Sequence, residues 1–334
     1  MEKLLISNSP HIRSKVTTKG IMIDVLIALA PALIMSVVYF GLNALCVILL
    51  ASVSAVAAEW IYKLILKKTF KEVVNEFDFT SLVTGVLIAM NMPSTVLWKG
   101  WYVPIIASVF AIVVVKMLFG GTGKNFVNPA IAGRIMVFLS FSSLMTSGWV
   151  NPSIGAIFST MPETGSTVLT GSVLTHSIEN ISSLDLLLGT GVAGCLGETC
   201  KIALILGGAY LVIKKVIDLK PLIYIAIVGV MTVAFNGWNF GYFLPSILSG
   251  GLILGAIFMA TDYVTCPNTT IGSYIYFVLL GVLTAWLRQR NGMEVVSFVI
   301  LIGNICSPLI DRFVIPKPFG YEKPEKKKAE KGGN

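Results

Sequence analysis

The sequence predicts an all-α polytopic membrane protein, and three observations lead to that class. Of the 334 residues, 55% are hydrophobic and only 13% are charged, whereas soluble domains carry about 25% charged residues. The mean hydropathy of the chain is +0.83. The apolar residues come in runs of roughly 16–24, long enough to cross a hydrocarbon core of about 30 Å as helices. These runs predict about ten transmembrane helices, since each run can cross the bilayer once.

Short polar stretches separate the apolar runs and set the boundaries of the predicted spans. The runs lie at about 20–41, 43–66, 80–98, 102–120, 129–147, 184–213, 221–237, 245–262, 272–287 and 293–314. Residues 1–19 are polar and lack the apolar core of a signal peptide, so they predict a cytoplasmic N-terminal segment. A transmembrane domain at 20–315 follows. Residues 316–334 are charged and almost devoid of apolar groups, which predicts a disordered cytoplasmic tail.

The basic residues predict how the spans are oriented, because short cytoplasmic loops hold an excess of Lys and Arg. With the N-terminus inside, 21 of the 25 Lys and Arg residues fall on the cytoplasmic side. Both termini are then cytoplasmic. The loop at about 148–183, which contains no Lys or Arg, is extracytoplasmic. The net charge of +8 therefore reflects orientation in the membrane and contact with lipid, and it predicts no nucleic-acid partner.

Two arginines near the C-terminal end do not fit this orientation. Arg288 and Arg290 fall on the outer side, where the predicted loops otherwise hold only Lys99 and Lys201. Either the two arginines line an outer pocket for an anionic group, which is the interpretation we favour, or the last two spans are misplaced.

Two stretches of the chain resemble each other. Residues 80–95, TSLVTGVLIAMNMPST, and 249–265, SGGLILGAIFMATDYVT, are each an apolar helix that stops at a polar break. We expect them to be equivalent broken helices of two inverted five-helix repeats, an arrangement common where a central site lies between broken helices. The alternative is two unrelated Gly-rich helices.

Polar breaks in the apolar runs supply candidate site residues. Irregular backbone at membrane depth persists only where protein or a polar ligand satisfies it. The breaks lie at 91–93, 120–129, 189–199 and 261–267, and the candidates within them are Asn125, Asn128, Glu198 and Asp262. Acids in such places usually face a cavity, an ion or a partner, although Glu198 could equally cap a helix N-terminus. The sequence predicts no catalytic set and no metal-ligand set, since no CxxC pair occurs and only two histidines are present.

The external loop contains one further candidate. Residues 161–172 read MPETGSTVLTGS, and Thr164, Gly165, Ser166 and Thr167 form its Thr-Gly-Ser-Thr turn. A loop of this length between helices is often functional. Taken alone, the turn is also what many ordinary surface loops contain.

Several motifs together resemble those of a known family. They are SPHIRSKVTT (9–18), IMIDVLIALAPAL (21–33), FGGTGKNFVNPAIAGR (119–134), GETCKIALILGGAYL (197–211), GAIFMATDYVTCP (255–267) and NICSPLIDRF (304–313). The chain thereby resembles the D subunit of Rnf complexes, the ion-pumping ferredoxin:NAD oxidoreductases, and the related B subunit of sodium-pumping NADH:quinone reductases. The shorter chain favours the Rnf family.

The resemblance implies covalently bound FMN. In that family a Ser/Thr-Gly-Ala/Ser-Thr motif carries FMN on its last threonine, which is Thr167 here, and a flavin transferase makes the linkage. Met161 and Val168 depart from the family pattern, which usually has Asp and often Pro at these places. Relatives also hold noncovalent riboflavin, for which the broken segments containing Asn125, Asn128, Glu198 and Asp262 are candidates.

The resemblance also implies a role. The chain would relay electrons within a complex that also contains the A, B, C, E and G subunits, oxidises ferredoxin, reduces NAD and pumps Na⁺ or H⁺, and it would not be catalytic alone. The alternatives are a component like the B subunit of a sodium-pumping NADH:quinone reductase, a solute channel or transporter, and a scaffold that only anchors partner subunits.

Overall fold

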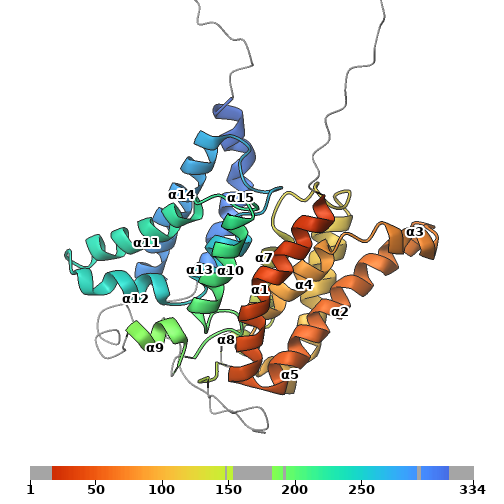
Figure 1. Cartoon of the computed structure of the whole chain (residues 1–334), viewed down its shortest axis with the longest axis horizontal. Coiled ribbons are helices and arrows are strands. Elements are labelled where there is room, and N and C mark those ends of the chain that lie inside the picture. The colour runs from red at the N-terminus through yellow and green to blue at the C-terminus, as the bar shows by residue number, and fades with distance from the viewer. Residues whose placement is uncertain (1–16, 147–148, 153–182, 191–192, 292–294, 316–334) are drawn as a thin grey trace, which may run out of the picture.

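The computed structural model describes residues 17–146, 149–152, 183–190, 193–291 and 295–315 (Figure 1). Within these ranges every regular element is a helix, apart from one isolated antiparallel bridge between Val150 and Gly194. The predicted all-α class is therefore confirmed. The first 16 residues, most of the 148–183 loop and the tail from 316 lie outside the described residues, so the predictions made for them stay predictions.

The helices up to residue 146 account for the first five predicted runs and add one helix that the sequence did not predict. They are α1 (Thr18–Phe40), α2 (Leu42–Ile65), α3 (Phe70–Asn75), α4 (Thr80–Met90), α5 (Val96–Gly100), α6 (Tyr102–Val109), the π-helix η1 (Phe110–Met117), α7 (Pro129–Ser140) and α8 (Ser142–Thr146). The unpredicted helix is α3, which is too short and too polar to form an apolar run. We call α1 to α7 the first half of the molecule.

The remaining described helices account for the other five predicted runs. They are α9 (Ser183–Leu188), α10 (Lys201–Ile213), α11 (Pro221–Phe235), the 3₁₀-helix η3 (Phe240–Tyr242), α12 (Phe243–Leu248), α13 (Leu252–Leu254), the π-helix η4 (Gly255–Met259), α14 (Thr270–Asn291) and α15 (Val296–Phe313). We call α10 to α15 the second half.

The described helices are apolar enough for a membrane-embedded protein. Four of them, α1, α2, α14 and α15, are long enough to cross a bilayer alone, and the bent pair from Phe240 to Met259 makes a possible fifth. The other apolar helices are shorter. Each predicted run thus contains a helix, but the total of about ten spans remains a prediction.

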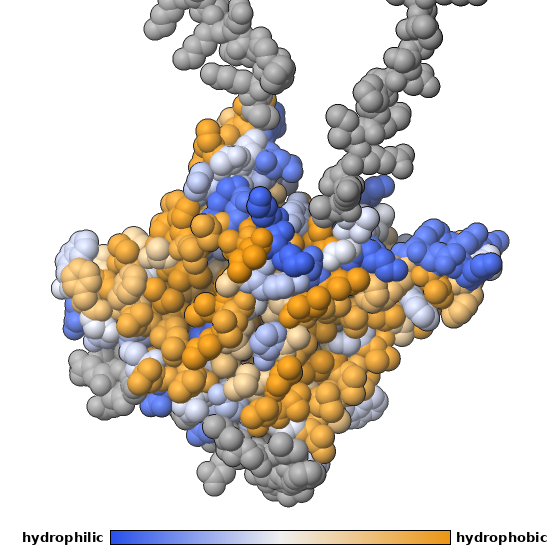
Figure 2. All heavy atoms as spheres, in the orientation of Figure 1, coloured by the Kyte–Doolittle hydropathy of each residue, from blue (hydrophilic) through white to orange (hydrophobic). Residues whose placement is uncertain are grey.

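The surface shows the same membrane character. Hydrophobic residues cover most of the visible face over α1, α2 and α11, and hydrophilic residues gather along the upper edge and around α3 (Figure 2). Ile34, Val53 and Val230, of α1, α2 and α11, are each more than half exposed. Soluble monomers rarely expose contiguous apolar areas of this extent. The chain is therefore a membrane-embedded protein.

The two halves meet through two helix pairs. In the packing of the helices α1 contacts α10, and α7 contacts α15, and the first pair lies side by side at the centre of Figure 1. Gly207 allows the close approach of α10 to α1, because a Cβ at that position would lie 2.1 Å from the carbonyl oxygen of Ala28. Small residues commonly permit such contacts between membrane helices. One hydrophobic core extends across both halves.

Both predicted helix ends are present, and the second half contains an additional bend. In the first half α4 ends at Met90, directly before the predicted break at 91–93. In the second half the helix pair bends by 67° between Leu248 and Leu252, where Gly250 has a φ of 63°. η4 ends at Met259, so the helix stops directly before Thr261 and Asp262, where the sequence predicted its end. The bend is an additional break that the sequence did not predict. Gly250 explains the position of the bend, since glycine adopts a positive φ at little cost.

Candidate functional site

A cavity of about 410 Å³ lies between the two halves. The first half contributes the start of α1, the start of α4, Lys116 of η1 and the connection from η1 to α7. The second half contributes Leu211, residues 216–217, the end of η4 and residues 261–264. A site built this way exists only when the halves are packed together.

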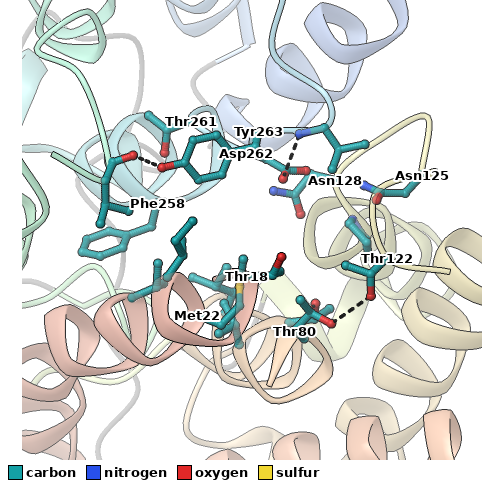
Figure 3. A pocket seen from close by; sticks show the side chains of 18 of the residues that line it. Thr18, Met22, Thr80, Thr122, Asn125, Asn128, Phe258, Thr261, Asp262 and Tyr263 are labelled. Atoms are coloured by element: carbon teal, nitrogen blue, oxygen red, sulfur yellow. Dashed lines mark hydrogen bonds between the residues drawn. The ribbon is translucent and has the colours of Figure 1, made fainter. Parts of the chain in front are cut away.

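One side of the cavity is apolar and the rim is polar. The apolar side includes Met22, Val25, Leu87, Ile257 and Phe258. The polar lining residues are Thr18, Thr80, Thr84, Lys116, Thr122, Asn125, Asn128, Thr261 and Asp262. Figure 3 shows Asn128 and Asp262 facing Thr18 and Thr80 across one open space. An apolar pocket with a few placed polar groups is the usual form of a small-molecule site.

Three of the four candidates from the polar breaks meet in this cavity. Asn128 caps α7, because its Oδ1 accepts from the N–H of Ala130 at 2.9 Å and Pro129 occupies the first position of the helix. Its Nδ2 donates to the carbonyl oxygen of Met259 at 3.0 Å and so joins the halves. The cap explains why the sequence Asn-Pro starts a helix at the cavity wall.

The other two candidates meet across the same boundary between halves. Asn125 is buried and donates from Nδ2 to the carbonyl oxygen of Val127 at 3.0 Å. Both Asn125 and Asp262 line the cavity. Asp262 accepts from the hydroxyl of Thr265 at 3.2 Å. The Asp262 carboxylate thus organises the turn after η4.

A polar network borders the cavity next to the start of α4. The Asp78 carboxylate accepts from the Thr80 hydroxyl at 2.5 Å and from the Thr122 hydroxyl at 2.7 Å. Burial raises the pKa of Asp78, but these hydrogen bonds and the charge of Lys116 outweigh burial and hold the pKa below its ordinary value. Asp78 is therefore an anion at neutral pH. Sequence analysis missed this group, because Asp78 precedes an apolar run and looks like a loop residue.

Glu198 does not belong to the cavity. Its Oε1 accepts from the backbone N–H of Cys195 at 2.7 Å, and its Oε2 lies 3.4 Å from the Cβ that Gly251 would carry. The carboxylate therefore binds a backbone group of a turn, and α10 has Cys200 as its N-cap, with no side-chain cap hydrogen bond. Glu198 is buried within residues 193–200, which link α9 to α10.

The same connecting segment satisfies the break in α4. The N–H groups of Leu196 and Gly197 donate to the carbonyl oxygens of Met92 and Met90 at 3.0 Å and 2.7 Å. The Cys195 thiol donates to the carbonyl oxygen of Asn91 at 3.3 Å. Protein groups therefore satisfy this irregular backbone.

Several basic residues that the sequence analysis counted toward one side of the membrane are buried inside the bundle. Lys116, Arg134, Lys201 and Arg288 are all no more than 6% exposed. Arg134 donates from one NH1 to Asn91 and to Ser297, both at 2.7 Å. The positive-inside rule counts charges by sequence position and cannot distinguish a buried base near a helix end from a loop base.

The sequence analysis expected Arg288 to line an outer pocket for an anionic group, but its side chain binds backbone carbonyl groups. Its guanidinium is 2% exposed and donates to the carbonyl oxygens of Ser246 and Ser249 at 2.9 Å and 3.2 Å. These carbonyls belong to the end of α12, where a cation also complements the helix dipole. Arg288 therefore supports the bend of the second half, and the expected outer pocket for an anion is not where this side chain points. Exposed Arg290 lies over the ring of Trp286.

The residues of the Thr-Gly-Ser-Thr turn cannot be placed in this arrangement. Thr164, Gly165, Ser166 and Thr167 lie outside the described residues. The expectation that Thr167 carries FMN therefore stays a prediction.

The fold and cavity together define a helical membrane protein with a ligand-sized site between two packed halves. The chain belongs to the NQR2, RnfD, RnfE family, whose model matches residues 5–320. The resemblance inferred from the sequence motifs is thus confirmed.

Named relatives agree with that membership. The chain is 38% identical to the D subunit of the Na(+)-translocating ferredoxin:NAD(+) oxidoreductase complex of Acetobacterium woodii, covering 97% of each chain. It is 35% identical to the D subunit of the proton-translocating ferredoxin:NAD(+) oxidoreductase complex of Clostridium ljungdahlii, covering 94% of this chain and 96% of the relative. It is 32% identical to the D subunit of the ion-translocating oxidoreductase complex of Escherichia coli, covering 95% of this chain and 99% of the relative.

Proposed function

We propose that this chain is the D subunit of an ion-translocating ferredoxin:NAD oxidoreductase of the bacterial inner membrane and relays electrons through bound flavin. Family membership and the names of the relatives support the complex. The observation that carries the relay role is the cavity, because Asn125, Asn128 and Asp262, chosen from the sequence as flavin candidates, line it together. The partners are the A, B, C, E and G subunits, and the electrons pass from ferredoxin towards NAD.

The first flavin is FMN attached through its phosphate to Thr167. The family motif at 164–167 supports this assignment, and a flavin transferase partner supplies the reactivity that a threonine hydroxyl lacks. A denaturing gel of cells that contain the transferase, viewed under ultraviolet light, tests the linkage. A fluorescent band that is lost in Thr167→Ala and retained in Thr170→Ala is expected. Fluorescence that persists in Thr167→Ala, or none in the unaltered chain, would refute the assignment.

The second flavin is noncovalent riboflavin in the cavity between the halves. Its volume of about 410 Å³ is within the range of about 300–1,000 Å³ for small-molecule sites. An isoalloxazine has an apolar dimethylbenzene end and a polar edge with carbonyl groups and an N–H. The cavity matches this division, since Met22, Ile257 and Phe258 form an apolar side opposite a rim of amides and hydroxyls.

The rim offers both donors and acceptors for the polar edge. The Asn128 amide keeps a second N–H after its bond to Met259. The hydroxyls of Thr84 and Thr261 donate to helix carbonyls at 2.9 Å and 2.6 Å, so their oxygen lone pairs face a ligand N–H as acceptors. Bound flavin would supply the electron-transfer chemistry. The residues of the chain bind it, orient it and exclude water.

Filling the cavity tests the riboflavin site without removing any polar contact. Val25 of α1 lines the cavity, whereas Ile27 on the same helix is 49% exposed. Val25→Trp should abolish acid-extractable riboflavin from the purified chain, and Ile27→Trp should leave it unchanged. Equal riboflavin in both variants would show that the flavin lies elsewhere.

The topology completes the proposal. We place about ten spans in two inverted five-helix repeats, with the domain at 20–315 between a cytoplasmic N-terminal segment and a cytoplasmic tail. The packing of α2 on α4 and α6, paralleled by that of α11 on α12 and α14, supports the repeats. Green fluorescent protein fused to either terminus should fluoresce, and a fusion inserted in the 148–183 loop should not, because that protein matures only in the cytoplasm.

A further inference from the structure

A buried ammonium group lies on the wall of the cavity. Lys116 of η1 is 3% exposed and is a lining residue. Its Nζ lies 3.0 Å from Oε2 of Glu59, and the other carboxylate oxygen of Glu59 lies 2.6 Å from Nζ of Lys63. Lys116 and Lys63 thus share one carboxylate. The Asp78 carboxylate, which binds the Thr80 hydroxyl and interacts with the charge of Lys116, adds a second negative charge, so the four side chains are neutral overall.

The two lysines differ in what they face. Lys116 also donates to the Thr80 hydroxyl, and Thr80 itself lines the cavity. Neither Lys63 nor Glu59 is among the lining residues. The arrangement therefore directs one cation of the pair towards the space between the halves and keeps the other behind it.

Structural stability alone does not account for this arrangement. Desolvating a lysine and a glutamate costs several kcal/mol per ion, and apolar replacements of buried ion pairs are often neutral or stabilising. Lys116 also lies in a π-helix, a distortion that frequently occurs at functional sites. A buried charge in a membrane protein is by default a candidate functional group.

We propose that Lys116 is the fixed positive charge of the flavin site and stabilises the negative charge that the isoalloxazine gains on reduction. The inference rests on the proposed riboflavin site. Oxidised flavin is neutral. It gains two electrons, delivered one at a time from reduced ferredoxin through partner subunits, and one proton from water at N5. The product is an anion with its charge on the pyrimidine ring. Glu59 is the positioning residue, since it holds the ammonium at the wall without facing the ligand.

The consequence is a preference for reduced over oxidised riboflavin. An ammonium beside the ring attracts the reduced anion and has little effect on the neutral oxidised form. Replacing Lys116 by methionine should therefore raise the ratio of the dissociation constants, reduced over oxidised, by about tenfold, as expected for unit charges a few Å apart in a partly screened site. A tenfold change corresponds to about 30 mV of lower potential for a two-electron couple.

The experiment compares two lysines that share one carboxylate. The full-length chain in a Thr167→Ala background is purified in detergent, and anaerobic titration with oxidised and with dithionite-reduced riboflavin gives both dissociation constants. Lys116→Met should shift their ratio, whereas Lys63→Met should not, although each variant leaves Glu59 with one lysine partner. Lys116→Arg should restore the ratio, because it keeps the charge.

The outcomes separate this inference from the function on which it rests. If the unaltered chain binds no riboflavin, the proposed riboflavin site is wrong and the inference falls with it. If riboflavin binds and Lys116→Met leaves the ratio unchanged, or if Lys63→Met changes it equally, the inference alone is overturned. If Lys116→Met weakens both forms equally, Lys116 has only a structural role in the site and the inference is likewise overturned.

Discussion

The adjacent glycines Gly207 and Gly208 of α10 provide a test of how the halves are packed. A Cβ at Gly207 would lie 2.1 Å from the carbonyl oxygen of Ala28 on α1, whereas a Cβ at Gly208 would lie 3.0 Å from side-chain carbons of Ile257. Backbone of a packed helix cannot yield locally, but an isoleucine side chain can. Gly207→Ala therefore has to move α10 away from α1, and Gly208→Ala does not.

The expected difference in the free energy of unfolding follows from comparing the two glycine variants. Both replacements gain the same helix propensity, about 1 kcal/mol for Gly to Ala, so that contribution cancels in their difference. Overpacking costs about 1–3 kcal/mol where the surroundings cannot relax. We expect Gly207→Ala to be about 2 kcal/mol less stable than Gly208→Ala, because its contact with Ala28 is about 1 Å shorter than atoms normally approach.

Unfolding of the purified protein in mixed micelles with increasing sodium dodecyl sulfate, followed by tryptophan fluorescence, measures this difference. Met22 and Val25 on α1 and Leu211 on α10 all line the cavity, so Gly207→Ala should also lose riboflavin. Equal stability of the two glycine variants would refute the close packing of α1 on α10. A stability loss without riboflavin loss would refute the location of the site between the halves.

Three further variants test the buried polar groups. Because the pKa of Asp78 lies below its ordinary value of 3.8, the ionised carboxylate stabilises the fold above that pH and the stabilisation is lost as the pH falls through the folded pKa. Thermal unfolding of Asp78→Asn should accordingly lack the acid-dependent loss seen in the unaltered chain below about pH 4. Asn91→Leu removes an acceptor of the buried Arg134 guanidinium and should lower the free energy of unfolding by about 2–3 kcal/mol. The double variant Asn91→Leu, Arg134→Met should recover part of that loss. Additive losses in the double variant would contradict the coupling of the two residues. Arg288→Met removes two hydrogen bonds to the end of α12 and should lower stability by about 2 kcal/mol, whereas Arg290→Met, at an exposed position, should change it by less than about 0.5 kcal/mol.

The positions of the helices could be predicted from the sequence, because a membrane imposes long apolar runs. Every predicted run contains a helix, and the start of α7 follows from the Asn128-Pro129 pair. The sequence also predicts the helix end before Thr261 and Asp262, but not the additional bend between Leu248 and Leu252. Thr261 and Asp262 are the more conspicuous polar residues there, but the bend depends on the backbone freedom of Gly250.

Part of the candidate site could be predicted from the sequence, because polar residues are conspicuous within apolar runs. Asn125, Asn128 and Asp262 stand out as polar groups in apolar surroundings, and the structure brings them to one cavity. Lys116 does not stand out, because it precedes the loop Gly120–Asn125 and so resembles a cytoplasmic anchor. Whether the Lys116 side chain points into the bundle depends on which face of its helix it occupies and on its partner Glu59, which lies 57 residues earlier. No local sequence pattern contains that information.

The break after α4 links the cavity to residues 193–200, which follow the loop predicted to be extracytoplasmic. Asn91 receives a thiol hydrogen bond from Cys195, whose segment follows that loop in sequence. Its amide donates to the carbonyl oxygen of Leu87, a cavity residue, at 2.7 Å, and accepts from Arg134, which also bonds to Ser297 of α15.

Hydrogen bonds between buried groups at this junction therefore join both halves, the cavity wall and the segment that contains Cys195. Electron transfer between two flavins requires a constant separation rather than a moving contact. A rigid junction meets that requirement, since the close packing of protein interiors gives it little room to adjust. Under the proposed function, Asn91→Leu should then lower the rate of electron transfer between FMN on Thr167 and riboflavin in the cavity, even in membranes where the variant remains folded. Flash-photolysis kinetics of the two flavins in Asn91→Leu measure that rate, and an unchanged rate would show that the junction supports the fold alone.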